Sequence, residues 1–228
     1  MSYVIAIGAV LVYSTVIFFL IRNVAKGRLP DLILSVLFGV VSAVLALGLE
    51  FLWNYQLGSI NRSHPSLIFI ESFFGVSLIE ESAKWMWLVF VISRWKKFVF
   101  YLDGTLYACG IAAGFNLVEE ILYATIDPSP VSMMFRSFTA VPVHFFLGIV
   151  MGYLFAKYKF ESPQFLWLSL LIPVIIHGVY DFFVLQQYAE LLIGVAVLVI
   201  LGSLALSVWI IRTAKKADRI RIVLSKQT

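Results

Sequence analysis

Seven long apolar runs, separated by short polar connectors, constrain this sequence more than any other feature. A transmembrane helix needs about 20 consecutive apolar residues. Only 13% of the residues are charged, against about 25% in soluble domains. We therefore predict an all-α, polytopic transmembrane helical bundle of about seven spans, with residues 1–228 forming a single membrane-embedded domain. The predicted spans are approximately 3–21, 31–55, 67–93, 104–125, 136–156, 164–186 and 190–212.

The basic residues predict the orientation of this bundle. Three of them follow the first span, three follow the third, two follow the fifth and six lie at the end of the seventh, which makes 14 of the 17 Lys and Arg residues. Arg62 and Arg136 are the two on the opposite side. Because basic loops stay in the cytoplasm, the N-terminus is predicted outside and the C-terminus inside. The net charge of +4 then reflects topology, and we expect no nucleic acid partner.

The tail at residues 214–226 is also basic, and two descriptions of it fit the sequence equally well. It lies along the anionic inner leaflet of the membrane, or it is a disordered basic tail.

Ionisable residues lie inside four of the predicted spans, which makes them the first place to look for function. Each charged side chain near the bilayer centre costs roughly 2.5–3.5 kcal/mol on insertion scales. Interhelical hydrogen bonds average only around 0.6 kcal/mol, too little to explain so many such groups as packing devices. These residues are Glu80, Glu81, Lys84, Glu119, Glu120, His144, His177 and Asp181.

These groups are predicted to form one layer in the outer half of the membrane. Counted from a charged residue at the cytoplasmic end of each span, Glu80, Glu119, His144 and His177 lie 13 to 16 residues away, or roughly 20–24 Å. Pairs spaced i,i+4 place each polar stripe on one helix face. Glu50 and Glu71 are expected at the outer interface, and Glu120 at the periphery of the cluster. The pairs are Glu80 and Lys84, Phe115 and Glu119, His144 and Gly148, and His177 and Asp181.

The charge of the layer limits its chemistry. Five ionised carboxylates against Lys84 would leave −4 in a medium of low dielectric constant, which cannot persist. Some carboxyl groups hold protons, the histidines are protonated, a divalent cation binds, or some side chains point elsewhere. Two kinds of water activation remain open: a glutamate acting as general base, and a catalytic zinc site with histidine and glutamate ligands.

In these residues the sequence resembles the PrsW family of intramembrane proteases, which shares a superfamily with the CAAX prenyl endopeptidases and bacteriocin-immunity membrane proteins. The resemblance covers approximately residues 67–186, the motif-bearing core. The family pattern is a glutamate pair with a lysine soon after, then FxxxE, HxxxG and HxxxD on successive helices. It is matched here by Glu80-Glu81 with Lys84, Phe115 with Glu119, His144 with Gly148, and His177 with Asp181.

The resemblance implies an endopeptidase that cleaves single-span proteins, such as anti-sigma factors at a first site, in a prokaryotic plasma membrane. It implies that Glu80 and Glu81 activate water and that His144 and His177 serve as oxyanion or metal groups. Lys84, Glu119 and Asp181, with Phe115 and Gly148 of the motifs, are the supporting residues. Zinc or another divalent cation is the candidate cofactor, and its candidate ligands are Glu81, Glu119, His144 and His177.

Two other functions remain open. A non-catalytic immunity or receptor protein could keep the same motifs. A proton- or metal-coupled transporter would also place carboxylates and histidines inside its helices, although the sequence shows no inverted repeat of the kind that many transporters have. The substrate and the oligomeric state cannot be predicted from the sequence.

Overall fold

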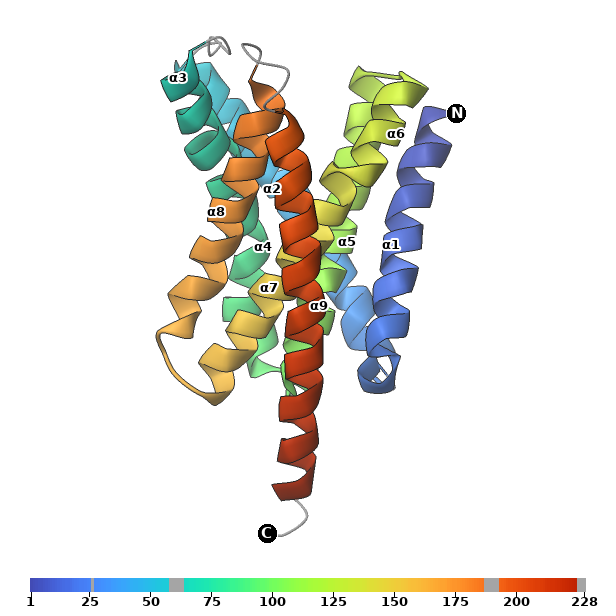
Figure 1. The fold of residues 1–228 in the computed structure, drawn as a ribbon, viewed down its shortest axis with the longest axis vertical. Coiled ribbons are helices and arrows are strands. Elements are labelled where there is room, and N and C mark those ends of the chain that lie inside the picture. Colours follow the sequence, from blue (N-terminus) through green and yellow to red (C-terminus); the bar gives the residue numbers. More distant parts are fainter. Residues whose placement is uncertain (26, 58–63, 187–192, 225–228) are drawn as a thin grey trace.

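The computed structural model describes every residue of the chain except 26, 58–63, 187–192 and 225–228 (Figure 1). The described part is helical and contains no β-strand. Of the basic residues used to predict the orientation, Lys26, Arg62, Lys226 and the Arg22 side chain lie outside the description. The elements are α1 (Ser2–Ala25), α2 (Leu29–Leu57), α3 (Pro65–Ile70), the π-helix η1 (Glu71–Ser77), α4 (Leu78–Phe90), the 3₁₀ helix η2 (Ile92–Arg94), α5 (Tyr101–Ile126), α6 (Pro130–Phe138), α7 (Ala140–Phe160), α8 (Phe165–Leu185) and α9 (Ile193–Leu224).

The helices confirm the predicted polytopic bundle, and the chain is a multi-pass membrane protein. Six described segments are long and apolar enough to cross a membrane, and α6 and α7 together form one of them. The remaining predicted span, 67–93, corresponds to α3, η1 and α4, which follow one another from Pro65 to Phe90. The π-helical turn in this span was not predicted, and such turns occur frequently at functional sites. The inside and outside faces remain a prediction.

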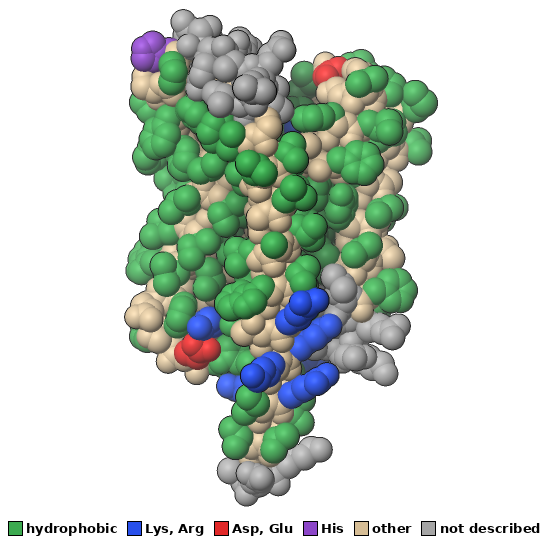
Figure 2. Space-filling view, viewed as in Figure 1, with side chains coloured by type: hydrophobic (Ala, Val, Ile, Leu, Met, Phe, Trp, Pro, Cys, Tyr) green, Lys and Arg blue, Asp and Glu red, His purple; other side chains and the backbone are tan. Residues whose placement is uncertain are grey.

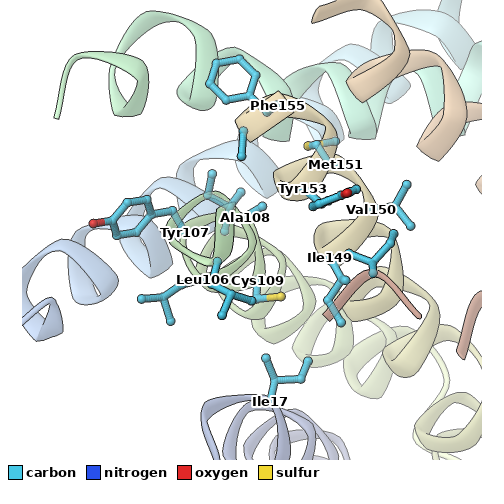
Figure 3. Close-up of a cluster of buried hydrophobic side chains, with 14 of the residues drawn as sticks. Ile17, Leu106, Tyr107, Ala108, Cys109, Ile149, Val150, Met151, Tyr153 and Phe155 are labelled. Atoms are coloured by element: carbon cyan, nitrogen blue, oxygen red, sulfur yellow. The ribbon is translucent and has the colours of Figure 1, made fainter. Parts of the chain in front are cut away.

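Helices α5 and α7 form the centre of the bundle. Every residue of α7 from Ala140 to Tyr153 is buried, as are the first twelve residues of α5. The two helices approach closely where Gly104 faces Gly152, because a Cβ atom on either glycine would strike the backbone carbonyl of the other. Around this crossing lies an apolar core that includes Leu106, Cys109 and Ile149 (Figure 3). This core extends along α7 from Val141 to Ala156.

The predicted span 136–156 is broken near its start. Helix α6 ends at Phe138 and α7 begins at Ala140, with a non-helical backbone at Thr139 (φ −122°, ψ −74°). Ser129 caps α6 by accepting a hydrogen bond from the Ser132 N–H, and a proline in the first turn suits a helix start. The break interrupts the regular helix between Arg136 in the last turn of α6 and His144 in α7.

Lys and Arg side chains gather at the end of the molecule where α9 extends beyond the other helices (Figure 2). Helix α9 is held there by Asp218, whose two carboxylate oxygens accept the N–H groups of Tyr101 and Leu102 at the start of α5, at 2.7 and 3.1 Å. Helix N-termini leave such N–H groups unsatisfied. Asp218 therefore caps α5 from a position 117 residues further along the chain.

Candidate active site

A cavity of about 270 Å³ opens among the helices in the half of the molecule away from this basic end. Side chains from α2, η1, α4, α5, α6, α7 and α8 line it. Apolar residues such as Leu47 and Leu122 alternate with ionisable ones along its walls. The ionisable and amide side chains of the lining are Glu50, Asn54, Glu71, Glu80, Glu119, Arg136, His144, His177 and Asp181, and Tyr123 and Tyr180 add two phenol groups.

Lys84 is the central cation of this site. Its Nζ lies 2.8 Å from Oε1 of Glu81, 3.3 Å from Oε2 of Glu80 and 3.1 Å from Nδ1 of His144. The ring of Phe115 covers the ammonium group, with Nζ 4.0 Å from the ring centroid. Because an ammonium group only donates hydrogen bonds, Nδ1 of His144 must accept one. The Lys84 side chain is 5% exposed, so these partners replace the water that the charge would otherwise need.

His177 lies between two carboxylates. Its Nδ1 is 2.9 Å from Oε1 of Glu81, the same oxygen that Lys84 contacts, and its Nε2 is 3.3 Å from Oδ2 of Asp181. A carboxylate cannot donate a proton, so a protonated His177 ring can satisfy both partners. The rings of His144 and His177 meet edge to face with centroids 5.0 Å apart.

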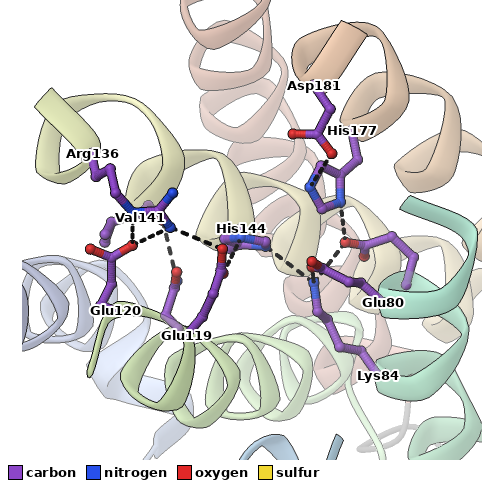
Figure 4. A network of polar contacts seen from close by, with 11 residues as sticks. Glu80, Lys84, Glu119, Glu120, Arg136, Val141, His144, His177 and Asp181 are labelled. Atoms are coloured by element: carbon purple, nitrogen blue, oxygen red, sulfur yellow. Dashed lines mark hydrogen bonds and ion pairs between the residues drawn. The ribbon is translucent and has the colours of Figure 1, made fainter. Parts of the chain in front are cut away.

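His144 is held on its other side by a charged chain of contacts (Figure 4). Its Nε2 lies 2.8 Å from Oε2 of Glu119, and Oε1 of Glu119 accepts a hydrogen bond of 2.9 Å from Nη2 of Arg136. Nη2 and Nε of Arg136 also donate to Oε1 of Glu120, at 2.6 and 2.9 Å. The guanidinium group stacks on Tyr123, 3.4 Å from the ring centroid. Arg136 thus joins the two adjacent glutamates of α5.

The structure changes the predicted membership of the cluster. Arg136 was predicted only as a basic residue on the outer side of the membrane; its side chain is 15% exposed and bridges Glu119 and Glu120. Glu120 does not line the cavity, in agreement with its predicted place at the edge of the cluster, but it is fully buried. Glu50 and Glu71, which we predicted at the interface, border the cavity instead. One signal for Arg136 was available in the sequence. It is an arginine eight residues before His144, close to an apolar span, and the neighbouring span carries Glu119 and Glu120 without a basic partner.

The remaining motif residues have structural positions. Gly148 packs against α5, where a Cβ atom would lie 3.1 Å from the Ala108 carbonyl oxygen. Cys109 is buried in the apolar core. Asn116, next to the second motif, is buried and donates a hydrogen bond of 3.3 Å to the Val141 carbonyl.

Four residues at the centre of the site could hold a metal ion together. Glu80, Glu81, His144 and His177 each offer one ligand atom, and these atoms lie within 4.8 Å of one another. Zinc accepts this mixture of imidazole and carboxylate ligands. Metal-bound histidines usually have a carboxylate beside their second nitrogen, and here the Nε2 atoms of His144 and His177 lie 2.8 and 3.3 Å from carboxylate oxygens. Glu119, predicted as a ligand, lies behind His144, and Glu80 takes its place in the group.

The donor set therefore fits a divalent cation, on one condition. Lys84 contacts ligand atoms of Glu80, Glu81 and His144, so its ammonium group would have to withdraw from them before a second cation could bind.

A comparison with known proteins shows which protein family the chain resembles. The family model described as PrsW family intramembrane metalloprotease matches residues 28–208. This match covers every residue of the site and extends beyond the motif-bearing core at both ends. No solved structure matches the chain.

The chain is similar to several bacterial proteins. The Protease PrsW of Clostridioides difficile is 29% identical over 192 residues, which cover 80% of each chain. The Protease PrsW of Oceanobacillus iheyensis is 32% identical over 170 residues, or 73% of this chain and 77% of the relative. That of Bacillus subtilis is 32% identical over 118 residues, about half of each protein.

Proposed function

Because the chain belongs to the PrsW family of intramembrane metalloproteases, we propose that it is an endopeptidase that cleaves single-span membrane proteins inside the described cavity. The observation that supports this most is the convergence of Glu80, His144 and His177 on the wall of one cavity, with ligand atoms within 4.8 Å. Water activation needs a base and a nearby positive charge, and both are present.

The position of the cavity suggests the kind of substrate. Its lining reaches Asn54, Ile126 and Leu185, which lie at or near the ends of α2, α5 and α8. If the N-terminus is outside, as the basic residues predict, water enters from the outer face. A peptide bond close to the outer end of a substrate's single span could then reach Glu80. Anti-sigma factors with one membrane span, cleaved at a first site, fit this geometry.

Glu80 and Glu81 have different surroundings, and we assign them different roles. Glu80 lines the cavity, whereas Glu81 is 1% exposed and contacts Lys84 and His177. Glu80 would accept a proton from water as the water oxygen attacks the peptide carbonyl carbon. When the C–N bond breaks, Glu80 would return that proton to the leaving nitrogen. Glu81 would keep Lys84 and His177 in place.

Positive charge next to the cavity would stabilise the negative oxygen of the tetrahedral intermediate. Lys84 and a protonated His177 are the groups placed to supply it, and preorganised charges of this kind are a large part of enzymatic rate enhancement. His144 would hold Lys84 through Nδ1. A divalent cation, when bound by Glu80, Glu81, His144 and His177, would supply Lewis-acid polarisation and a more acidic water.

The test is cleavage of tagged single-span anti-sigma factors from the host organism, with enzyme and substrate reconstituted together in liposomes. Glu80→Gln should lower kcat by about 10²–10⁴-fold, the usual contribution of general acid–base catalysis. Glu161→Gln, a half-exposed carboxylate at the far end of α7, is the matched control and should cleave like the wild type. If Glu80→Gln cleaves at the wild-type rate, Glu80 is not the base.

A further inference from the structure

Arg136 is not part of the four sequence motifs, but it contacts two buried glutamates of the site. One is Glu119, the partner of His144, and the other is Glu120. Its guanidinium group reaches both Glu119 and Glu120 and is fixed by the Tyr123 ring. Removing one member of such a buried network leaves the other charges unpaired, which is costly. The question is whether Arg136 only satisfies these charges or also sets the geometry of the reaction.

The two oxygens of Glu119 have separate partners. Oε1 accepts from Nη2 of Arg136 at 2.9 Å, and Oε2 lies 2.8 Å from Nε2 of His144. A carboxylate bound through one oxygen to a planar guanidinium group loses rotational freedom, and Arg geometry favours such fixed contacts. The second oxygen is therefore aimed at His144.

The neighbours of His144 indicate which of its nitrogens carries the proton. Nε2 faces a carboxylate oxygen of Glu119, which can only accept, so Nε2 carries the hydrogen. Nδ1 faces the ammonium group of Lys84, which can only donate, so Nδ1 is bare. The hydrogen bond made by one ring nitrogen fixes the role of the other. Arg136 contacts Glu119, and Glu119 contacts Nε2 of His144, so Arg136 can influence the ring through one intermediate residue.

We propose that Arg136 is a positioning residue of the hydrolytic site: it fixes Glu119 so that the His144 ring is held in the Nε2–H form with its bare Nδ1 turned toward Lys84 and the metal-ligating centre. The catalytic part of this proposal rests on the proposed function, whereas the predicted ring form of His144 does not depend on it. In this role Arg136 acts on His144 through Glu119.

The break between α6 and α7 makes this arrangement possible. Arg136 is in the last turn of α6, and His144 is in the second turn of α7, beyond the non-helical Thr139. The two side chains therefore approach Glu119 from separate helical segments. The short α6, of which only the last residues fell inside the predicted span 136–156, thus carries a residue of the site.

The direct test is ¹⁵N NMR of histidine-labelled protein reconstituted in lipid. The chain has only three histidines, and the exposed His64 serves as the reference. The wild type should show His144 with Nε2 protonated and Nδ1 unprotonated or metal-bound. Arg136→Gln should give a mixture of the two ring forms, and Arg136→Lys, which keeps the charge without the fork, should give an intermediate spectrum. Glu120→Gln, which leaves the contact between Arg136 and Glu119, should preserve the wild-type spectrum.

Cleavage kinetics give a second readout. Arg136→Gln should lower kcat by about 10–100-fold, as loss of an outer partner of a catalytic histidine typically does, while KM stays near the wild-type value. Added methylguanidinium should restore both the spectrum and part of kcat in Arg136→Ala, because it can refill the vacated space.

Two results would overturn the proposal: a wild-type His144 spectrum in Arg136→Gln, or a spectrum in Glu120→Gln as disturbed as that in Arg136→Gln. If no substrate is cleaved by the wild type, the proposed function fails while the spectra still decide the role of Arg136.

Discussion

The two histidines of the site differ in what surrounds them. His144, on the α5–α6–α7 side of the cavity, lies between the Lys84 ammonium group and Glu119, which Arg136 holds. His177, on the α4–α8 side, lies between the carboxylates of Glu81 and Asp181. The first ring has one donor and one acceptor as neighbours, which fixes it in a neutral form. The second has two acceptors, which favour a ring that carries both protons.

This difference suits His144 and His177 to different roles in the proposed reaction. A fixed neutral ring suits the orientation of a neighbour, and a protonated ring suits stabilisation of negative charge. Two motif histidines that look equivalent in the sequence are therefore expected to respond differently when their outer partners are changed.

The largest effects are expected from those outer partners. Glu119→Gln and Asp181→Asn should each lower kcat by about 10–100-fold, but through different rings. Because Asp181→Asn removes one of two anions beside His177, that ring should lose its extra proton in the ¹⁵N spectrum while His144 stays unchanged. Glu119→Gln should disturb His144 and leave His177 as it is. If the signals of both histidines change in either variant, the protonation of His144 and that of His177 are coupled and the contrast between them fails.

A smaller effect concerns the metal. Lys84→Met removes the ammonium group that competes for Glu80, Glu81 and His144, so we expect zinc to bind at least about tenfold more tightly, or about 1.4 kcal/mol. Competition with a chromophoric chelator measures this affinity in detergent. Adding Glu81→Gln to Lys84→Met should reverse the gain. An unchanged zinc affinity in Lys84→Met would show that zinc is not bound by the residues that Lys84 contacts.

The smallest effect concerns how each histidine-bearing helix is packed. A methyl group at Gly152 of α7 would strike the Gly104 carbonyl, whereas one at Gly178 of α8 would meet the side chain of Phe73. Overpacking costs about 1 kcal/mol or more, so Gly152→Ala should lower the thermal unfolding midpoint in detergent by about 2–4 °C. Gly178→Ala should lower it less, because a side chain can move more easily than a backbone. Equal losses would contradict this contrast between the two helices.

Much of the fold could be predicted from the sequence because the membrane limits the choices. Backbone polar groups in lipid must be paired within a helix, so seven long apolar runs lead to a helical bundle. The predicted span 136–156 lies within one apolar segment, Pro130–Phe160, but the break at Thr139 was not predicted. The π-helical turn at Glu71–Ser77 also went unpredicted, because neither feature alters the apolar composition on which the prediction depends.

The sequence also determined which residues share one level of the membrane, because depth along a helix is proportional to residue number. It placed Glu80, Glu81, Glu119, His144 and His177 in one layer before any contact was known. Depth does not fix the direction in which a side chain points, nor which atom meets which across two helices.

Only the tertiary structure decided those points. It brought the long side chain of Arg136, in the last turn of α6, against two glutamates on α5. It placed Glu80 on the cavity wall and Glu81 behind it, although the two are adjacent in the sequence. It also gave the two histidines unlike neighbours. Each outcome depends on the rotation and spacing of packed helices, which the packing of the whole bundle sets.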